Sequence, residues 1–356
     1  MRICDLDYDL PPELVAQAPL PERDGSRLLC LDAATGGIRH RRFGDLPGLL
    51  PDGAMIVVND SRVFPARIAC RKRTGGRAEA LLVRRIHGSA GRERWLALVG
   101  AGGRVREGMI LGTPTLSITI AGRHGGEGQR GDPLFLLDIE ALVGTVADAI
   151  AREGTVPLPP YISRAAEASD AERYQTIYAA VEGSAAAPTA GLHFTSSLLS
   201  RLEAAGHPLF GMTLHVGPGT FLPVRTAALD DHVMYGEWAR IPEATAIGIE
   251  AGRRDGRSLV AVGTTVVRTL ESVAERSGAI VPWEGEVNAF IRPGHRFAAV
   301  DHLITNFHLP RTTLLALVMA LAGRDRVMAA YSEAVRERYR FYSYGDAMLV
   351  LARPPD

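Results

Sequence analysis

The chain has 356 residues, a formal net charge of +0, 46% hydrophobic residues and 22% charged residues. This balance predicts about two folded domains with a sizeable core, and it excludes a protein that is electropositive overall, although a local basic patch stays possible. Cys4, Cys30 and Cys70 give no C-x-x-C pair and no even-numbered disulfide framework. The N-terminus lacks a basic and then apolar signal, so we expect a cytoplasmic protein without a membrane span.

The first strand signal in chain order ends at NDSRVFPAR, residues 59–67. Asp60, Ser61 and Arg62 follow its apolar residues directly, so they come at the carboxyl end of the predicted strand. Open α/β sheets bind ligands at the carboxyl ends of their strands. These polar side chains are therefore candidates for a ligand site.

Residues 66–154 differ from both ends of the chain. Short apolar runs such as AEALLV, RWLALV, TLSITIAG and PLFLLDI alternate with glycine-rich turns. Leu116, Ile118 and Ile120 alternate with polar residues, which is the period-two pattern of a strand with one buried face. The segment predicts a small barrel or sandwich, and residues 122–131 predict a glycine-rich hairpin tip.

The rest of the chain predicts an α/β arrangement. Residues 197–206 have a capped helix pattern and precede the strand LFGMTLHV, and Pro242 to about Arg254 precedes the strand SLVAVG and the helix TTVVRTLESVAERSG. Alternating strands and helices predict a mostly parallel sheet with helices on both faces. Residues 1–65 are too few to form such a domain alone. We therefore expect a discontinuous α/β domain, 1–65 and 155–356, with a domain inserted over 66–154.

Gly263, Thr264 and Thr265 lie where a predicted strand turns into a helix. Free backbone N–H groups and two hydroxyls at this point suit a phosphate or a carboxylate. An ordinary threonine cap explains the same residues. Spacing alone does not separate the two interpretations.

Three further motifs place histidines or an acid at predicted strand or loop ends. PTAGLHF contains His193, His215 directly precedes VGPGTFLPV, and DHVMYGEW contains His232 and Glu237. A single histidine is more often a structural hydrogen-bonding group than a catalyst. Several polar groups of this kind at strand ends favour one shared site.

The stretch ITNFHLPRTTLLALVMALAG places Asn306, Phe307 and His308 immediately before a strongly apolar helix. A loop between a strand and a helix normally needs a cap and little else. This polar, aromatic and imidazole trio therefore predicts a surface that contacts a ligand.

Several other chemistries are disfavoured. VGPGTF and VGAGG lack the third glycine that opens the helix of a dinucleotide-binding loop. No two histidines lie three or four residues apart and no cysteine pair exists, so the sequence predicts no metal site. A G-x-S-x-G nucleophile motif is absent as well. Metal-free proton transfer is the chemistry left open.

Seven motifs follow one another in this chain: NDSRVFPAR, KRTGGRAEALL, APTAGLHF, LHVGPGTFLPV, AVGTTVVRTLES, LITNFHLPRTTLL and RYRFYSYGDAML. In this order they resemble the S-adenosylmethionine:tRNA ribosyltransferase-isomerase family of queuosine biosynthesis. The resemblance runs from the opening LDYDLPPELVAQAPLPERDGSRLL nearly to the C-terminus. It implies an α/β domain that carries an inserted antiparallel β-barrel, in agreement with the periodicity.

The resemblance also implies a reaction. The family moves the ribosyl part of S-adenosylmethionine onto the aminomethyl group of a 7-deazaguanine base at the wobble position of tRNA. The products are epoxyqueuosine in tRNA, adenine and methionine. S-adenosylmethionine is then a consumed co-substrate, and neither a metal nor a further cofactor is implied. The expected partner is tRNA that carries the 7-aminomethyl-7-deazaguanine precursor, and the expected state is a monomer.

This reaction needs a general base, because a sulfonium makes the neighbouring C5′ hydrogens of the ribose acidic. His193, His215 and Glu237 are the candidates for the base. Asp60 is a further catalytic candidate.

The reaction also needs groups that hold the substrates. Gly263 to Thr265 with Arg268 are candidates for the methionyl carboxylate, and Phe221 or Phe307 for a contact with adenine or the sulfonium. The candidate substrate-binding residues are Arg62, Thr189, Gly191, Gly217, Gly219, Thr220, Phe221, His232, Gly263, Thr264, Thr265, Arg268, Asn306, Phe307, His308, Tyr344 and Asp346.

The chain departs from the family pattern at a few positions. Tyr235 stands where a second histidine is usual in H-x-M-H-x-E, and Thr312 stands where serine is usual. Arg62 and Arg311 replace common lysines, which preserves the charge. A role that requires imidazole at position 235 is therefore not expected.

Two other functions remain open from the residues alone. Another S-adenosylmethionine-dependent RNA-modifying enzyme, such as a methyltransferase, would release S-adenosylhomocysteine instead of adenine and methionine. A non-catalytic RNA-binding protein would bind RNA without consuming the donor.

Overall fold

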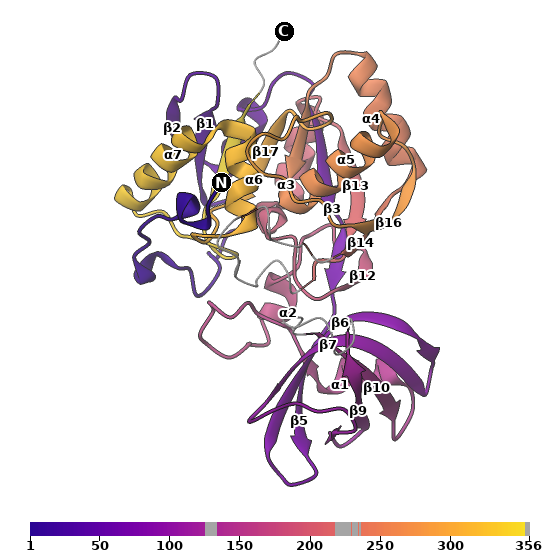
Figure 1. Ribbon diagram of the computed structural model, residues 1–356. Helices are drawn as coiled ribbons and strands as arrows, with labels where there is room; N and C mark the ends of the chain where they lie inside the picture. Colours follow the sequence, from indigo (N-terminus) through magenta and orange to yellow (C-terminus); the bar gives the residue numbers. More distant parts are fainter. Residues whose placement is uncertain (125–133, 218–228, 230–233, 235, 353–356) are drawn as a thin grey trace.

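The computed structural model describes residues 1–124, 134–217, 229, 234 and 236–352. A large body built on a β-sheet carries a smaller β-barrel at one end (Figure 1). The N-terminus lies on the large body, and the chain passes into the barrel and returns before it completes the sheet. The barrel is thus an insertion, as the sequence predicts.

The large sheet contains nine strands within the described residues. In spatial order they are β16 (Trp283–Val287), β14 (Glu237–Ile241), β13 (Leu209–Leu214), β3 (Met55–Asn59), β15 (Leu259–Val262), β17 (His302–Asn306), β18 (Ala347–Leu351), β1 (Arg27–Asp32) and β2 (Ile38–Arg42). The central strands β13, β3, β15 and β17 are parallel, as are β18 and β1. The other neighbours pair antiparallel, so the sheet is mixed around a parallel centre.

The central strands are buried on both faces. In β3 every residue is buried, and successive side chains point to opposite faces of the sheet. Met55 and Val57 join one apolar cluster, whereas Ile56 and Val58 join another. This explains the continuous apolar runs of the central strands, because a parallel sheet is covered on both sides.

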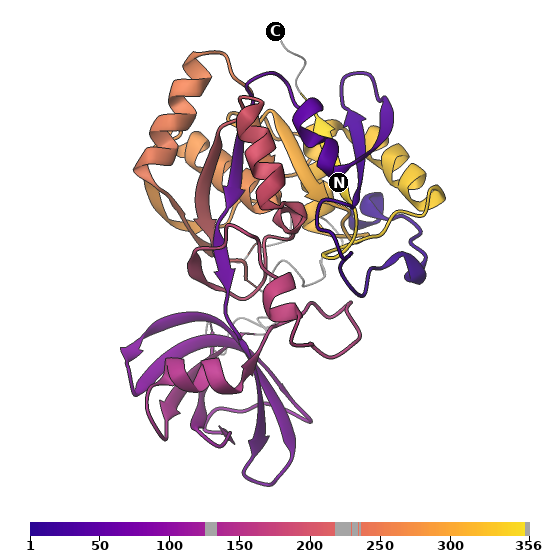
Figure 2. The same ribbon diagram turned by 180° about the vertical axis from the view of Figure 1, so that it is seen from behind.

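Helices cover both faces of the sheet. Residues of α4 (Glu243–Arg254), α5 (Thr264–Ser277), α6 (Thr313–Ala322) and α7 (Arg324–Arg336) belong to one apolar cluster. Leu198 and Leu202 of α3 (Ser196–Ala204) belong to the other, and α3 lies in front when the molecule is seen from behind (Figure 2). The predicted α/β domain with helices on both faces is therefore confirmed.

Short elements complete the large body. The 3₁₀ helices are η1 (Ile3–Leu6), η2 (Pro12–Leu14), η3 (Phe43–Gly48) and η4 (Thr189–His193), and a short helix α2 spans Asp170–Arg173. The 3₁₀ helix η4 packs beside the end of β17. This contact brings the PTAGLHF motif next to the ITNFHLP motif.

The barrel is a closed ring of strands. Its strands are β5 (Arg67–Lys72), β6 (Arg77–Ser89), β7 (Arg92–Ala101), β10 (Leu134–Ala141), β9 (Leu116–Arg123) and β8 (Ile110–Gly112), and β8 pairs back to β5. Leu116, Ile118 and Ile120 are buried, as their alternation predicts. The helix α1 (Val146–Glu153) packs Val146 and Ile150 into the same apolar cluster. The predicted inserted β-barrel is therefore confirmed.

The two bodies are joined by a small junction. Beside the sheet, β4 (Ser61–Val63) pairs with β12 (Val181–Ser184), and β11 (Gly154–Thr155) pairs with β5 of the barrel. Arg84 of β6 forms an ion pair with Glu286 of β16. A division into a domain over 66–154 and a discontinuous domain over 1–65 and 155–356 stays a prediction.

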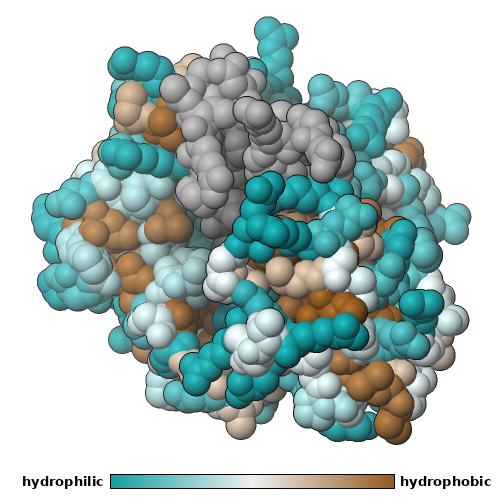
Figure 3. Space-filling model, turned by 60° about the horizontal axis from the view of Figure 1, so that its bottom comes forward, coloured by the Kyte–Doolittle hydropathy of each residue, from teal (hydrophilic) through white to brown (hydrophobic). Residues whose placement is uncertain are grey.

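The surface on the barrel side is mixed. Hydrophilic side chains separate its hydrophobic patches in the view that brings this side forward (Figure 3). Leu142 and Val143 are exposed hydrophobic residues of the loop between β10 and α1. In the part of the chain that the structure describes, no helix is both long enough and apolar enough to cross a bilayer.

Gly154, where the chain leaves the barrel, offers a test of the junction. A Cβ at this position would lie 2.0 Å from the carbonyl oxygen of Pro65 and 2.6 Å from that of Ile150. Because both atoms belong to the backbone, we expect Gly154→Ala to lower the free energy of unfolding by roughly 1–3 kcal/mol. Gly100→Ala is the matched control, since nothing lies within 4 Å of a Cβ at this barrel glycine. Equal chemical denaturation midpoints for the two variants would contradict the prediction.

Candidate functional site

Two hollows lie at the carboxyl end of the central strands. We call the smaller one the α5 pocket; it has a volume of about 80 Å³. Its described lining residues include Thr189, Gly263, Thr264, Thr265, Asn306, Phe307 and His308. Residues from η4, from the start of α5 and from the loop after β17 therefore meet in one place, as the sequence predicts.

The start of α5 leaves its backbone N–H groups available. Gly263 is the N-cap residue and has φ of 92°, a left-handed conformation that favours glycine. Within the described residues no side chain caps this helix, so the structure does not support the interpretation of Thr264 and Thr265 as ordinary caps. The Thr265 hydroxyl lies 3.4 Å from Asn59 Nδ2, whereas no hydrogen bond is found for the Thr264 hydroxyl among the described residues. The first turn of α5 can therefore accept an anion.

A chain of hydrogen bonds supports the other side of the α5 pocket. Thr189 Oγ1 donates to Asn306 Oδ1 at 2.8 Å, and Asn306 Nδ2 lies 3.4 Å from His193 Nε2. His193 Nδ1 lies 2.8 Å from Ser26 Oγ. Burial lowers the pKa of His193 to about 4, so its imidazole is neutral at pH 7. Both ring nitrogens of His193 have partners. This arrangement is better suited to positioning Asn306 than to general-base catalysis.

Phe307 contributes to the α5 pocket from the core, and the half-buried His308 follows it. The Phe307 ring packs against Tyr331, Tyr339 and Phe341, with ring centroids 5.0–5.5 Å away. His308 Nε2 lies 2.7 Å from Thr305 Oγ1, and burial strongly lowers the pKa of His308, to about 3. The loop that these residues form is therefore held firmly by the core.

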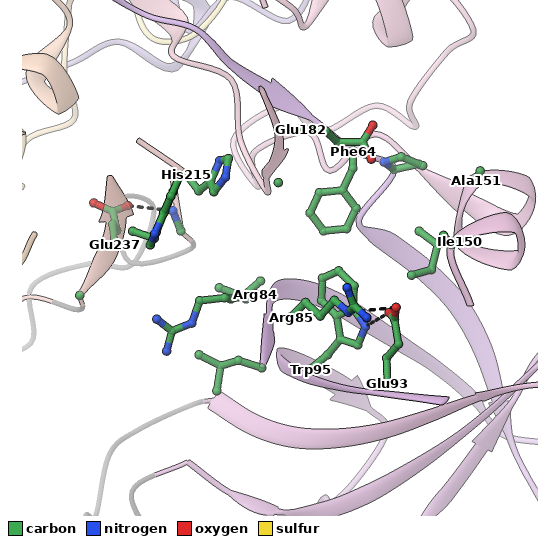
Figure 4. Close-up of a pocket in the computed structure, with 18 residues that line it drawn as sticks. Phe64, Arg84, Arg85, Glu93, Trp95, Ile150, Ala151, Glu182, His215 and Glu237 are labelled. Atoms are coloured by element: carbon green, nitrogen blue, oxygen red, sulfur yellow. Dashed lines mark hydrogen bonds and ion pairs between the residues drawn. The ribbon is translucent and has the colours of Figure 1, made fainter. Parts of the chain in front are cut away.

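The larger hollow lies between the barrel and the sheet, and we call it the junction cavity. It has a volume of about 550 Å³. Its described lining includes Phe64, Arg84, Arg85, Glu93, Trp95, Ile150, Glu182, His215, Gly217, Glu237 and Trp238 (Figure 4). A cavity of this size accommodates a nucleoside-sized ligand, and it contains both aromatic and charged groups.

His215 is the least engaged histidine of the site. Its ring stacks on Trp238 with centroids 4.8 Å apart, and a Cβ at Gly183 would come within 2.6 Å of Nε2. Neither ring nitrogen has a hydrogen-bond partner among the described residues, and Nδ1 is buried. Burial lowers the pKa of His215 to about 4. A neutral imidazole with unused nitrogens therefore borders the cavity.

Glu237 is held from two sides. The Gly217 N–H donates to its Oε1 at 2.7 Å, and Arg268 of α5 forms an ion pair with its Oε2. Both side chains of the pair are at least nine-tenths buried. Arg268 also donates to the carbonyl oxygen of Ala289 at 3.0 Å. Arg268 is thus engaged by Glu237 and Ala289, and its predicted action together with Gly263 to Thr265 stays a prediction.

The two hollows share a wall. His215 and Gly217 line the junction cavity, whereas Val216 between them lines the α5 pocket. Successive residues of an extended chain point to opposite sides, which explains this division. A bridge between Ala186 and Val216 fixes the segment. The two hollows are therefore adjoining compartments.

Several other predicted residues lie outside these hollows. Asp60 accepts from the Thr213 hydroxyl at 2.6 Å, and burial raises the pKa of Asp60. Arg62 is exposed on β4. Tyr344 donates to Asp170 at 2.8 Å, and Arg27 forms an ion pair with Asp346. The predicted catalytic or substrate-binding roles of Asp60, Arg62, Tyr344 and Asp346 stay predictions.

Two groups of predictions remain to be placed. Gly191 packs under Tyr178, where a Cβ would come within 2.2 Å of the phenolic oxygen, so it permits close packing of η4. Gly219, Thr220, Phe221, His232 and Tyr235 lie outside the described residues.

Sequence reasoning missed the contribution of the barrel. Arg85, Glu93 and Trp95 belong to the predicted barrel and Phe64 to the NDSRVFPAR motif; all four line the junction cavity, and none of them is a predicted site residue. A signal was present in the sequence: Glu93 and Trp95 are alternate residues of one strand, so a carboxylate is placed on the same side as an apolar ring. Among the described residues, no group of three or more His, Cys, Asp or Glu side chains is arranged to hold a metal ion.

Comparison with known proteins identifies relatives over nearly the whole chain. The family model described as "Queuosine biosynthesis protein" matches residues 3–350. An S-adenosylmethionine:tRNA ribosyltransferase-isomerase of Anaeromyxobacter dehalogenans is 50% identical over 99% of this chain and 100% of its own length, and one of Symbiobacterium thermophilum is 49% identical over the same shares. The crystal structure of an S-adenosylmethionine tRNA ribosyltransferase from Thermotoga maritima has a TM-score of 0.55 and 35% identity, with coverage of 98% of this chain and 100% of that one.

The buried histidines predict a pH-dependent stability. The pKa values of His193, His215 and His308 are lowered by burial, to about 4, about 4 and about 3, so the unfolded chain binds more protons than the folded one between these values and about pH 6.5. Stability therefore falls as the pH decreases from 6.5 to 4.5. Three such groups contribute a slope of roughly 4 kcal/mol per pH unit near pH 5. Denaturant titrations at several pH values should give this slope, and His308→Gln should reduce it by about a third. An unchanged slope in the variant would contradict the assignment.

Proposed function

The chain belongs to the queuosine biosynthesis family of S-adenosylmethionine:tRNA ribosyltransferase-isomerases, and from this premise we propose that the reaction takes place where the α5 pocket meets the junction cavity. The enzyme transfers and isomerises the ribosyl moiety of S-adenosylmethionine onto the 7-aminomethyl-7-deazaguanine wobble base of tRNA. Epoxyqueuosine in tRNA is formed, and adenine and methionine are released. S-adenosylmethionine is consumed as a substrate.

The sizes of the two hollows suggest how the substrates are divided. The α5 pocket, with about 80 Å³, has room for the end of a chain but not for a nucleoside. The junction cavity, with about 550 Å³, lies within the range of sites that bind whole small molecules. The ribose and purine of S-adenosylmethionine therefore belong in the junction cavity and the methionyl end in the α5 pocket.

The first turn of α5 suits the methionyl carboxylate. Its N–H groups are uncapped, and the positive end of the helix dipole favours an anion at this point. The Thr264 hydroxyl lines the same pocket and has no hydrogen bond to a described residue. The α5 pocket therefore supplies donors for the carboxylate, and none of its described lining residues is an arginine or a lysine.

The observation that carries the proposal is the state of His215. A base must be unprotonated before it removes a C5′ proton, and the lowered pKa of His215 keeps its imidazole neutral at pH 7. Its ring nitrogens are also free of described partners, whereas those of His193 are occupied. In this scheme the C5′ proton moves to His215 and the bond from the sugar to adenine breaks. The tRNA amine then bonds to the sugar, and methionine leaves as the epoxide closes.

Glu237 complements this base with a fixed negative charge. Arg268 and the Gly217 N–H engage its two oxygens, whereas the ring nitrogens of His215 have no partner among the described residues. A carboxylate held beside the cavity stabilises the cationic sulfonium and an imidazolium that forms next to it. Glu237 is therefore proposed as the electrostatic partner of the base.

The remaining features of the proposal follow from the family. No metal and no cofactor beyond S-adenosylmethionine is required in this scheme, and the enzyme acts as a cytoplasmic monomer on tRNA. A methyltransferase would release S-adenosylhomocysteine, and a non-catalytic RNA-binding protein would leave the donor intact. Chromatography of one reaction with precursor-containing tRNA distinguishes these functions, because release of both adenine and methionine is expected only for the proposed one.

Replacement of His215 tests the assigned base. We expect His215→Asn to lower kcat by at least about 100-fold, which is the usual contribution of a general base. His87→Asn is the control, because His87 is an exposed residue of the barrel strand β6. In the unmodified enzyme the acid limb of kcat/KM should lie near pH 4, not near pH 6.5, because the pKa of His215 is lowered to about 4. A His215→Asn enzyme with a near-normal kcat would remove this residue from the mechanism.

Replacement of Thr264 tests the carboxylate site. Thr264→Val keeps the shape of the side chain and removes its hydroxyl, so we expect the KM for S-adenosylmethionine to rise about 10-fold at nearly unchanged kcat. The KM for tRNA should stay the same, because the hydroxyl is assigned to the methionyl end alone. Steady-state kinetics with each substrate varied in turn would measure both values. An unchanged KM for S-adenosylmethionine would place the carboxylate elsewhere.

A further inference from the structure

The barrel supplies a wall of the junction cavity that the proposed mechanism does not use. Phe64, Arg85, Glu93 and Trp95 line this wall, whereas His215 and Glu237 come from the sheet (Figure 4). A second substrate must reach the same cavity, because the tRNA amine attacks the sugar there. The inference drawn from this wall rests on the proposed function.

Glu93 is a buried carboxylate with unused capacity. It is only 7% exposed, yet it lines the cavity. Arg85 Nε lies 2.9 Å from its Oε1, and Trp95 Nε1 donates to its Oε2 at 2.8 Å. A carboxylate offers about four acceptor positions, so roughly two remain for a ligand.

The position of Glu93 in the barrel is unusual for a charged residue. Glu93, Trp95 and Ala97 are alternate residues of β7 and share a side, and Ala97 belongs to the barrel core. Arg85 is the cross-strand partner of Trp95, and its side chain is 49% exposed. Burying a carboxylate against a half-exposed arginine gives little net stability. The buried Glu93 is therefore better explained by binding of a ligand than by a contribution to the stability of the barrel.

Aromatic rings frame this carboxylate. The centroids of Phe64 and Trp95 lie 5.6 Å apart, and both rings line the cavity. Flat aromatic surfaces next to a polar group are typical of sites that stack an unpaired nucleobase and read its Watson–Crick edge. The wall therefore has the two elements that recognition of a base requires.

The chemistry of the carboxylate selects the kind of base. Ionised, it only accepts hydrogen bonds. A guanine-type base presents two adjacent donors on its Watson–Crick edge, N1–H and the 2-amino group, whereas adenine presents one donor and one acceptor. A carboxylate can pair with both donors of the first edge but with only one group of the second.

We propose that Glu93, with the rings of Trp95 and Phe64, forms the pocket for the wobble base of the tRNA and reads its guanine-type edge. The base stacks on the barrel wall, and the Glu93 carboxylate accepts from N1–H and from the 2-amino group. The aminomethyl group, on the opposite side of the base, then faces the sheet wall that carries His215 and Glu237. Glu93 is a specificity-determining residue, and its carboxylate takes no proton in the reaction.

The experiment compares two anticodon stem-loop RNAs. One carries 7-aminomethyl-7-deazaguanine at the wobble position, and the other carries the same base without its 2-amino group. For the unmodified enzyme we expect kcat/KM to fall about 10- to 100-fold when the 2-amino group is missing, because one hydrogen bond to a charged group is lost. For Glu93→Gln we expect a similar fall with the full base and less than about threefold discrimination between the two RNAs.

The controls separate recognition from folding. Glu140→Gln changes an exposed glutamate of the same barrel and should keep the full discrimination. The KM for S-adenosylmethionine should be unchanged in Glu93→Gln. If Glu93→Gln slowed both RNAs equally and kept the discrimination of the unmodified enzyme, the residue would be structural and the proposal would be wrong.

The outcome of this experiment does not depend on whether His215 is the general base. Discrimination is a ratio between two RNAs measured on one active enzyme, so it survives even if His215→Asn turns out to have normal turnover. Conversely, a loss of activity in His215→Asn with full discrimination in Glu93→Gln would support the proposed mechanism and reject the base pocket.

Discussion

The buried ion pair between Arg268 and Glu237 is the contact on which the rest of the site depends. It ties α5 to β14, and the Gly217 N–H adds the segment that separates the two hollows. Both charges are shielded from water, so loss of one partner would leave an uncompensated charge at a cost of about 3–5 kcal/mol. Such a pair contributes little to stability compared with apolar packing. Its value is geometric, because it fixes the helix start relative to the cavity wall.

The two compartments on either side of this ion pair differ in size and in rigidity. The α5 pocket is closed by core residues such as Phe307 and by a neutral hydrogen-bonded chain through Asn306 and His193, so it is small and rigid. The junction cavity lies between two bodies joined by short strands and by the ion pair of Arg84 with Glu286. A small, rigid compartment suits the methionyl end of S-adenosylmethionine, which is the same in every turnover. A compartment made from two bodies suits a substrate that arrives on a large RNA.

The sequence predicted the elements better than their contacts. The alternation of Leu116, Ile118 and Ile120 identified a barrel strand, since periodicity is a local property. The pairing of Arg268 with Glu237 could not be read in the same way, because the residues are 31 positions apart and a long side chain can extend in several directions. The ion pair of Arg268 was therefore not predicted, and its role in holding the methionyl carboxylate stays a prediction. Glu93 was missed because it lies within a strand pattern that already had a structural explanation.

The charge distribution of the site follows from the charge of its substrate. S-adenosylmethionine brings a sulfonium, and a protonated histidine nearby would repel it. His193, His215 and His308 all have pKa values lowered by burial, so they remain neutral. The carboxylates of Glu237 and Glu93 each form an ion pair with an arginine. Imidazoles that are neutral before the reaction can accept a proton during it, and the carboxylates then stabilise the positive charge that this transfer creates. Burial thus keeps the histidines neutral by lowering their pKa values. The paired carboxylates offset the cost of placing the cationic sulfonium in the same buried cavity.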